Sequence, residues 1–240
     1  MATATTTNTT TFNVDLNNVV EEAFERCGAE LRSGYDMRTA QRSLNLMFAE
    51  WANRGINLWT LDTGTITLVA GTATYNLPLD TVDLLDHVTR TGSGTTQQDL
   101  NITRISSPTY LSIPNKNATG RPIQVWINRQ SGSTNANLTV AAPTITVWPV
   151  PETGSSYTFV YARLRRMYDA GVGYNIQDIP FRFLNAMTAG LAYFLSLKIP
   201  GAETRTMMLK QMYDESFQLA ADEDREKAAV RFVPRETFLR

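Results

Sequence analysis

The hydrophobic periodicity of this chain changes twice, and each change marks a junction between a helical and a β region. Up to Trp51 the apolar residues recur at intervals of three and four, as on one face of an α-helix. Gly55 follows, and from Leu58 the pattern alternates with a period of two, as in half-buried strands. The helical spacing returns after Pro180. The predicted order is therefore helices, a β region, and helices again.

Two helices are predicted before the first junction, over residues 14–32 and 36–53. The apolar face of the first consists of Leu16, Val19, Val20, Ala23, Phe24, Cys27 and Leu31. Asn13 or Asp15 can cap its start. The apolar stripe of the second consists of Ala40, Leu44, Met47, Phe48 and Trp51. Gly55 is expected to end this helix in a left-handed conformation, because glycine adopts a positive φ at low cost.

Residues 58–165 are predicted to form a compact β-sandwich or barrel. Only 13 of these 108 residues are Asp, Glu, Lys or Arg, and Thr, Val and aromatic residues are frequent. The segment TITLVAGTATYNL predicts a hairpin around Ala70 and Gly71. Further alternating strands are predicted in LLDHVTR, RPIQVWINR, NLTVAAPTITVWPVP and SYTFVYARLRR. Ser107 and Pro108 predict a single helical turn between them.

Two more helices are predicted after Pro180. The first is apolar on most sides, which indicates a central position, through Phe181, Leu184, Met187, Leu191, Phe194 and Leu195. The second runs from about residue 203 to 228 through Met208, Leu209, Met212, Tyr213 and Leu219. The predicted fold class is α+β: a four-helix bundle formed by the N- and C-terminal helices, with an inserted antiparallel β-sandwich or barrel module.

This order divides the chain into four kinds of segment. Residues 1–12 are a threonine-rich arm that we expect to be flexible. Residues 13–57 and 174–228 are predicted to form the helical bundle domain, and residues 58–173 the inserted β domain. Residues 229–240 are predicted to be an extended C-terminal tail.

The sequence offers few residues for a catalytic or metal site. The single cysteine, Cys27, lies on an apolar helix face and is expected in the core. The single histidine, His87, and its neighbour Asp86 point to opposite faces of a strand, so they do not form a catalytic pair. The loops TGSGTT and GVG lack the remaining residues of phosphate-binding motifs, and DEDRE is predicted to be a solvated helix face. No catalytic, cofactor-binding or metal-binding residue is predicted, and no cofactor.

Charge and hydropathy also limit the partners. The net charge is −1, so the chain has no basic footprint for gripping nucleic acid or a membrane surface. No apolar run approaches the roughly 18 residues that a membrane-spanning helix needs. The N-terminal residues lack the basic and apolar regions of a signal peptide, so we expect a cytosolic protein when made, without a membrane partner.

The predicted helix before the first junction ends in AEWANRG, and it is followed by LW and the segment TITLVAGTATYNLP. These stretches resemble phage head-to-tail adaptor proteins, the family of the podovirus packaged-DNA stabilisation protein and tail tubular protein A. The strand region ITVWPVPETGSSYTFVYAR and the helix DIPFRFLNAMTAGLAYFLSLKIPG are also similar to the family. The resemblance spans residues 14–200, with a looser match to the end.

The resemblance implies a structural virion protein rather than an enzyme. In the family, many copies form a ring under the portal, extend the DNA channel and join the tail, and a dodecamer would match the portal. The implied partners are the portal protein, a tail nozzle or tail tube protein, further copies of the chain, and double-stranded DNA that passes without sequence-specific binding. The implied location is the head–tail junction of the virion, after assembly in the host cytoplasm.

The resemblance also implies a portal-binding segment. The C-terminal tail of the family commonly reaches the portal, and this role maps onto the end of the chain. The residues concerned are Val230, Arg231, Phe232, Val233, Pro234, Arg235, Phe238, Leu239 and Arg240. The apolar members have no evident partner within their own segment, so we expect them to occupy pockets on another protein.

Two other function classes stay open from the residues alone. Pairs of Asp and Glu can serve a tail-associated cell-wall glycan hydrolase, but sequence does not position two carboxylates across a cleft. A carbohydrate-binding tail module is the other alternative, because Trp126 and Trp148 could stack on sugars. Both tryptophans lie in predicted strands, where burial in the core is the ordinary expectation.

Overall fold

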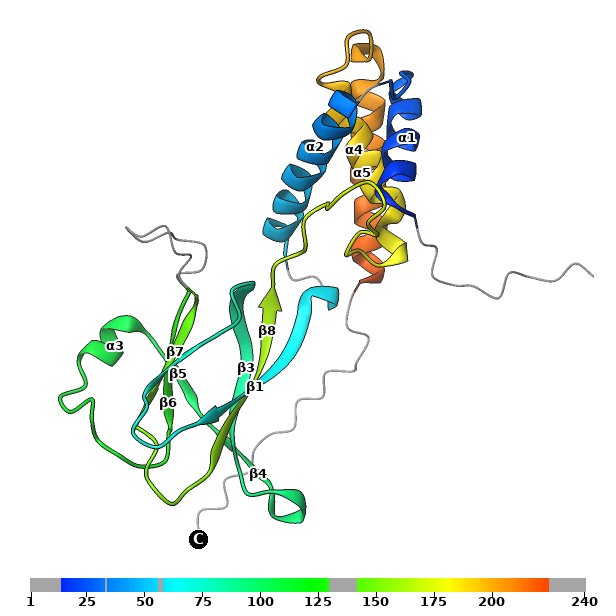
Figure 1. Cartoon of the computed structure of the whole chain (residues 1–240). Helices are drawn as coiled ribbons and strands as arrows, with labels where there is room; N and C mark the ends of the chain where they lie inside the picture. Colours follow the sequence, from blue (N-terminus) through cyan, green and yellow to red (C-terminus); the bar gives the residue numbers. More distant parts are fainter. Residues whose placement is uncertain (1–13, 33, 56–57, 130–141, 225–240) are drawn as a thin grey trace, which may run out of the picture. The chain divides into compact units, whose positions relative to one another are not determined.

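The computed structural model describes residues 14–32, 34–55, 58–129 and 142–224, and all structural statements below concern these residues (Figure 1). The chain divides into two compact units. The helical unit consists of Met1–Phe48 and Asp169–Arg240, and the β unit of Ala49–Tyr168. Each is described by itself. The predicted domain boundaries at residues 57 and 173 stay a prediction.

Helix α1 (Leu16–Cys27) begins and ends on local signals. The Asp15 carboxylate accepts a hydrogen bond from the Asn18 N–H at 2.9 Å, which confirms Asp15 as the cap. The predicted end at residue 32 is wrong, because the helix stops at Cys27. Gly28 takes the left-handed conformation with φ 79° and donates its N–H to the Glu25 carbonyl. Leu31 therefore lies beyond the helix.

Helix α2 (Gly34–Asn53) buries its whole predicted stripe, namely Ala40, Leu44, Met47, Phe48 and Trp51. It ends at Asn53, as predicted. Gly55 has φ 148°, a positive value that favours glycine, but one far from the left-handed helical region near about +57°. The predicted αL terminator is therefore wrong in its conformation, although the glycine does lie where the helix has stopped.

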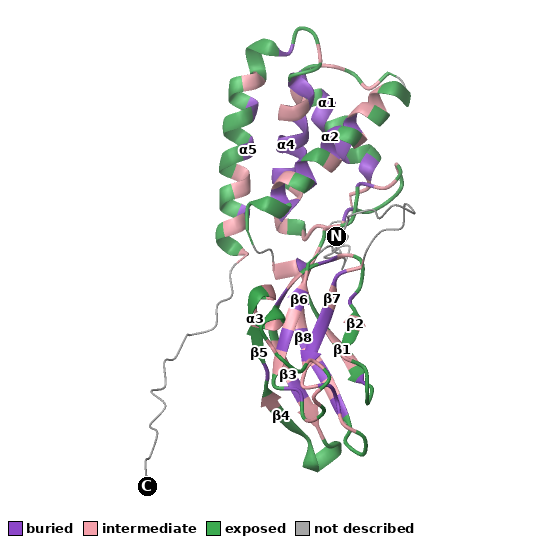
Figure 2. Cartoon of the chain, turned by 90° about the vertical axis from the view of Figure 1, so that its left-hand side faces the viewer, coloured by how far each residue is buried: buried purple, intermediate pink, exposed green. Residues whose placement is uncertain are grey.

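Helix α4 (Leu184–Ser196) follows a 3₁₀ turn (Phe181–Phe183) and is the most buried helix of its unit (Figure 2). Nine of its 13 residues are buried, and α1 and α5 (Glu203–Glu223) both pack against it. Gly190 brings it close to Met47 of α2 and Tyr213 of α5. The predicted central position is confirmed, except that Phe181 precedes the helix and is exposed.

Helix α5 departs from the predicted apolar face. Leu209 and Tyr213 are buried, as expected, whereas Met208, Met212 and Leu219 are exposed. The described part of the helix ends at Glu223, and the predicted continuation to residue 228 lies outside the described residues.

The described β unit contains two four-stranded sheets. One has the order β1 (Leu61–Leu68), β8 (Tyr157–Arg165), β3 (Thr81–Thr91) and β4 (Gln98–Asn101), all antiparallel. The other has the order β2 (Thr74–Asn76), β7 (Thr144–Trp148), β6 (Gln124–Asn128) and β5 (Thr103–Ile105). The pair β5–β6 is parallel, which corrects the all-antiparallel prediction. These strands do not close into a barrel.

Both sheets contribute to one hydrophobic cluster. It consists of Leu68, Leu77, Leu84, Ile102, Val125, Ile127, Ile145, Val147, Tyr157, Phe159 and Tyr161. The residues alternate along β6, β7 and β8, as a period of two requires. The Asp83 carboxylate adds a polar connection between the sheets, because it accepts from Arg104 at 2.9 Å and from Arg129 at 3.1 Å.

The predicted hairpin around Ala70 and Gly71 is wrong. A turn is present, with Gly71 at φ 78° and the Thr72 N–H donating to the Val69 carbonyl at 3.0 Å. The strands on its two sides enter different sheets, however, since β1 pairs with β8 and β2 pairs with β7. The turn residues encode a reversal of the chain, but the choice of pairing partner depends on distant strands.

Candidate functional site

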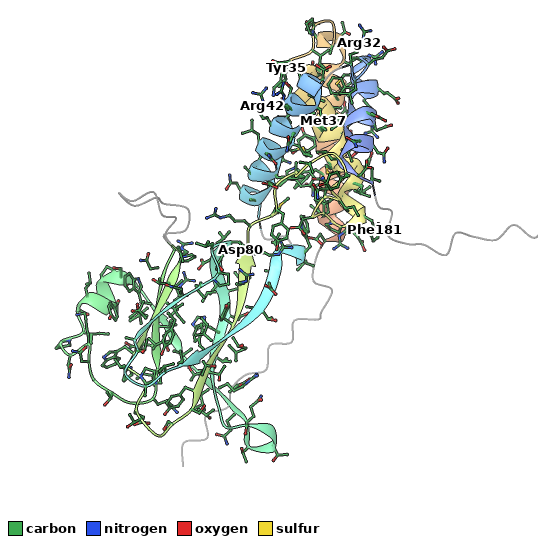
Figure 3. All side chains as sticks on the ribbon, in the orientation of Figure 1. Arg32, Tyr35, Met37, Arg42, Asp80 and Phe181 are labelled. Carbon is green, nitrogen blue, oxygen red and sulfur yellow. The ribbon has the colours of Figure 1, made fainter. Side chains whose placement is uncertain are left out.

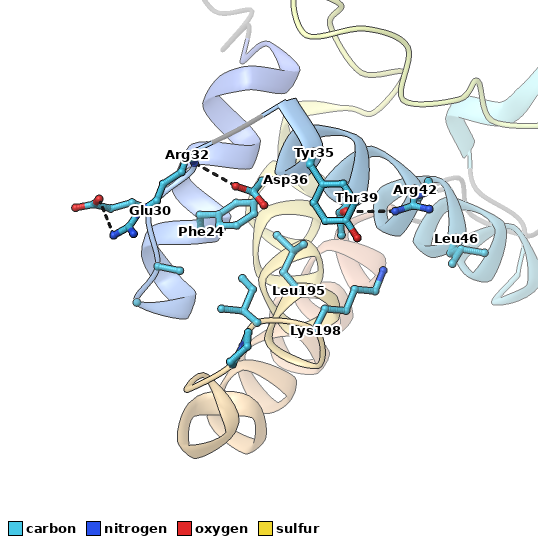
Figure 4. A pocket seen from close by; sticks show the side chains of 14 residues that line it. Phe24, Glu30, Arg32, Tyr35, Asp36, Thr39, Arg42, Leu46, Leu195 and Lys198 are labelled. Carbon is cyan, nitrogen blue, oxygen red and sulfur yellow. Dashed lines mark hydrogen bonds and ion pairs between the residues drawn. The ribbon is translucent and has the colours of Figure 1, made fainter.

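A groove of about 890 Å³ opens between three parts of the helical unit (Figure 4). Its walls are the end of α1 with the segment that follows, residues 35–46 of α2, and the end of α4 with residues 198–200. Gly28 shapes one wall, because its left-handed conformation turns the chain away from α1. All of these residues belong to the same compact unit.

The floor and the rim of the groove differ in exposure. Phe24 and Leu195 are buried side chains that line it from below. Tyr35 and Leu46 line it from α2 and remain 64% and 62% exposed. Large exposed apolar side chains beside a recess are typical of protein interaction sites.

The groove also carries three cations, two of which have no carboxylate partner among the described residues. Arg32 is paired with Glu30 at 3.4 Å, and its N–H donates to Asp36. Arg42 donates only to the Thr39 hydroxyl, and Lys198 donates to the Ser43 hydroxyl at 2.7 Å. Within the described residues, neither Arg42 nor Lys198 forms a salt bridge. The groove therefore suits a partner segment that combines apolar side chains with carboxylates.

Sequence reasoning missed this groove, although a signal was present. Tyr35 and Leu46 lie off the apolar stripe of α2, which is formed by residues three and four apart. A large apolar side chain on the polar side of an amphipathic helix points toward solvent or a partner. The convergence of α2 with the ends of α1 and α4 was not readable from the sequence.

Cys27 is the core residue that the sequence predicts. Its thiol donates to the Ala192 carbonyl at 3.1 Å, and burial raises its pKa to about 11 despite the nearby charge of Arg205. A thiol with a raised pKa is a poor nucleophile at neutral pH.

His87 is held by packing rather than by a catalytic partner. Its ring stacks on Phe159 with centroids 5.8 Å apart, and its Nδ1 is buried without a hydrogen-bond partner. Burial, followed by the charge of Arg104, lowers its pKa. Asp86 is exposed on β3, whereas His87 is half-buried, as expected for residues on opposite faces.

The two glycine-containing loops have structural roles. TGSGTT forms the tip between β3 and β4, with a 3₁₀ turn at Gly94–Thr96. The Gly173 carbonyl accepts from the N–H of Asn17 at the start of α1. A phosphate-binding loop presents N–H groups instead.

The segment DEDRE is not fully solvated. Its Asp224 forms a salt bridge with Arg182, and the side chain of Asp224 is only 4% exposed, so the predicted solvated face is wrong at this residue.

The two tryptophans of the carbohydrate alternative lie on the second sheet and are half-buried, not fully buried as expected. Trp126 stacks on Tyr110 of helix α3 (Ser107–Leu111) with centroids 5.2 Å apart. The indole N–H of Trp148 donates to the Asn115 carbonyl at 3.0 Å. The segment around α3 therefore engages both rings.

Two carboxylates of the β unit bind a shared arginine. Arg163 of β8 forms salt bridges with Asp62 and Asp80. Burial raises the pKa of Asp80, but the hydrogen bond and charge of Arg163 outweigh burial and lower the pKa overall. The general acid of a glycoside hydrolase needs a raised carboxyl pKa, whereas the pKa of Asp80 is lowered.

The predicted portal-binding residues 230–240 lie outside the described residues, as does the arm at 1–12. Within the described part of the chain, no cluster of His, Cys, Asp and Glu is arranged to hold a metal ion. None of the described helices is long and apolar enough to cross a membrane.

Figure 3 shows the side chains of both units, with Arg32, Tyr35 and Arg42 of the groove labelled.

In a comparison with protein families, the chain matches the model of the SU10 adaptor protein family over residues 16–235. The match covers the described helices and both sheets. Comparison with curated proteins gives no match.

Proposed function

The chain belongs to the SU10 adaptor protein family, a family of structural phage adaptors, and we propose from this premise that it joins the phage head to the tail. In this proposal, copies of the chain form a dodecameric ring under the portal. The ring extends the DNA channel during genome packaging and ejection, and binds a tail nozzle or tail tube protein below. The match over residues 16–235 is the observation that carries the proposal.

The architecture supports the proposal. We treat the helices α1, α2, α4 and α5 as one four-helix bundle, and the two sheets as a sandwich inserted into it. The domain boundaries at residues 57 and 173 belong to the same proposal. A subunit built in this way offers the helical part and the β part to different neighbours, as an adaptor between two assemblies requires.

The charge of the chain also suits a channel. DNA must slide through the ring, and a strongly basic wall would bind phosphates and slow its passage. A net charge of −1 avoids such binding. The DNA would then be a passing partner that is not read in sequence.

The proposed portal contact is the tail formed by Val230–Arg240. Phe232, Phe238 and Leu239 supply apolar anchors, and Arg231 and Arg235 supply charged contacts to portal carboxylates. The experiment is electron microscopy of tail-less, DNA-filled heads mixed with the full chain or with a chain lacking residues 230–240. The full chain is expected to add a ring at the portal vertex, and the truncated chain is expected to lose it.

A matched control is a chain with residues 230–240 replaced by a Gly-Ser sequence of equal length. Its loss of binding would show that the tail residues, rather than tail length, are needed. Unchanged binding by the truncated chain contradicts the tail assignment. Failure of the full chain to bind the portal vertex contradicts the adaptor proposal itself.

A further inference from the structure

Helix α5 carries an apolar face that is exposed in the part of the chain that the structure describes. Met208, Met212 and Leu219 are 55%, 40% and 77% exposed. With Glu215 they occupy positions i, i+4, i+7 and i+11, which share one side of an α-helix. The buried residues Leu209, Tyr213 and Ala220 lie on a neighbouring side. We call Met208, Met212, Glu215 and Leu219 the α5 face.

The α5 face also carries negative charge. Glu215 lies between Met212 and Leu219 and accepts a hydrogen bond from Gln211 at 2.7 Å. Among the described residues it forms no salt bridge. An apolar stripe with a carboxylate in its middle is the kind of segment that the groove suits. The groove has an apolar floor, and its cations Arg42 and Lys198 form no salt bridge among the described residues.

The two surfaces lie on different sides of the same unit. Figure 2 shows α5 on one side of the helical unit and α1 and α2 on the other, with α4 between them. The groove is lined by residues of α1, α2 and α4 with the segments that follow α1 and α4, and it shares no residue with the α5 face. One subunit can therefore present its groove to one neighbour and its α5 face to another.

We propose that the groove of one copy of this chain binds the α5 face of the next copy. The α5 helix lies in the groove as an amphipathic helix lies in an apolar cleft, with methionine and leucine side chains as anchors. Glu215 approaches Arg42 and Lys198, which fixes the direction of the contact. Such a contact is heterologous, so it closes into a ring when the rotation between copies allows it.

This inference rests on the proposed ring, for which it names the surfaces that join neighbouring subunits. The alternative occupant of a cationic groove is DNA. A nucleic acid site presents cations along a surface that follows the phosphates. Here the cations lie at the rim of a recess whose floor is formed by Phe24 and Leu195, which favours a protein segment.

The test uses two variants of the full chain. The groove variant carries Arg42→Glu, and the face variant carries Met212→Glu with Leu219→Glu. All three residues are exposed, so the fold is expected to persist, and thermal unfolding by circular dichroism checks this. Arg38→Glu is the matched control for the groove, since it is an exposed arginine of α2 outside the groove. Met207→Glu is the control for the face, because it is exposed on another side of α5.

Self-association is measured by sedimentation velocity and native mass spectrometry over the full range of soluble concentrations. The wild type and both controls are expected to form oligomers, and each variant alone is expected to lose them. An equal mixture of the two variants is expected to form dimers and nothing larger. The intact groove of the face variant can still bind the intact α5 face of the groove variant.

Three results of the self-association measurements overturn the inference. They are self-association of either variant at the wild-type level, no dimer in the mixture, and a wild type that stays monomeric at every concentration. The inference is also overturned if Arg42→Glu loses binding to a DNA duplex while its self-association is unchanged. That result would identify DNA as the occupant of the groove. Portal-vertex binding by the wild type, measured on tail-less heads, separates the two proposals, because it can succeed while the groove contact fails.

Discussion

Gly190 of α4 faces Met47 of α2 so closely that a Cβ at this glycine would lie 2.5 Å from the Met47 sulfur. The same Cβ would lie 2.8 Å from the ring of Tyr213 on α5. Both neighbours are buried, so neither has free space to move into. The absence of a side chain at one residue therefore sets how closely three helices approach.

The substitution Gly190→Ala should destabilise the protein. Overpacking against two buried side chains costs about 1–3 kcal/mol, which exceeds the helix-propensity gain of about 1 kcal/mol for alanine. Urea unfolding followed by circular dichroism measures the change. Gly34→Ala is the control, because Gly34 is also helical and a Cβ there meets nothing within 4 Å. An equal loss in both variants would contradict the packing argument.

Mildly acid conditions should weaken the β unit through His87. Burial, and then the charge of Arg104, lowers the pKa of His87 from 6.5 in the folded state, although Asp86 and the backbone of Ile102 act in the opposite direction. The unfolded chain thus binds the proton more readily. Stability is complete above pH 6.5 and falls as the pH drops through the folded pKa, by at most about 1.4 kcal/mol per pH unit.

The measurement is the free energy of unfolding between pH 7.5 and 5.5 for the wild type and His87→Phe. The variant keeps an aromatic ring for Phe159 and cannot be protonated. Its stability should be flat over this window, since His87 is the single histidine and the lowered pKa of Asp80 keeps that carboxylate ionised here. An unchanged pH dependence in the variant would assign the effect to other groups.

Cys27 should react with thiol reagents only after unfolding. A pKa of about 11 in place of 9.0 lowers the thiolate fraction near neutral pH by about 100-fold, and burial adds a steric barrier. The rate of reaction with a chromogenic disulfide is measured at pH 8 with and without denaturing urea. Fast stoichiometric reaction of the native chain would show that α1 opens readily from α4.

Replacing Arg163 should destabilise the β unit by leaving Asp62 and Asp80 without their shared partner. Arg163→Met is expected to cost about 1–3 kcal/mol, less than for a fully buried pair because both carboxylates retain solvent contact. Denaturant unfolding gives the value. Arg121→Met, at an exposed position, should change stability by less than about 0.5 kcal/mol. An equal loss of stability in the two variants would show that the salt bridges of Arg163 with Asp62 and Asp80 contribute little.

Local signals account for the parts of the fold that were predicted correctly. Asp15 caps α1, the stripe of α2 is buried throughout, and α4 is central, because capping and amphipathic spacing act within a few residues. Gly28 is equally local, and its role as terminator of α1 was missed because apolar residues continue beyond it to Leu31.

The sequence by itself determined the order of helices, a β region and helices again, the burial of α4 and the core position of Cys27, since these follow from periodicity along the chain. The strands β4 and β5 were not predicted. Only the tertiary structure decided that β1 and β2 enter different sheets, that β5 runs parallel to β6, and that Met208, Met212 and Leu219 stay exposed. It also brought Tyr35, Arg42 and Lys198 to one groove. The physical reason is the sequence distance over which each interaction acts. Helix capping and hydrophobic periodicity depend on residues a few positions apart, whereas strand pairing and side-chain exposure depend on which segments distant in sequence pack against each other.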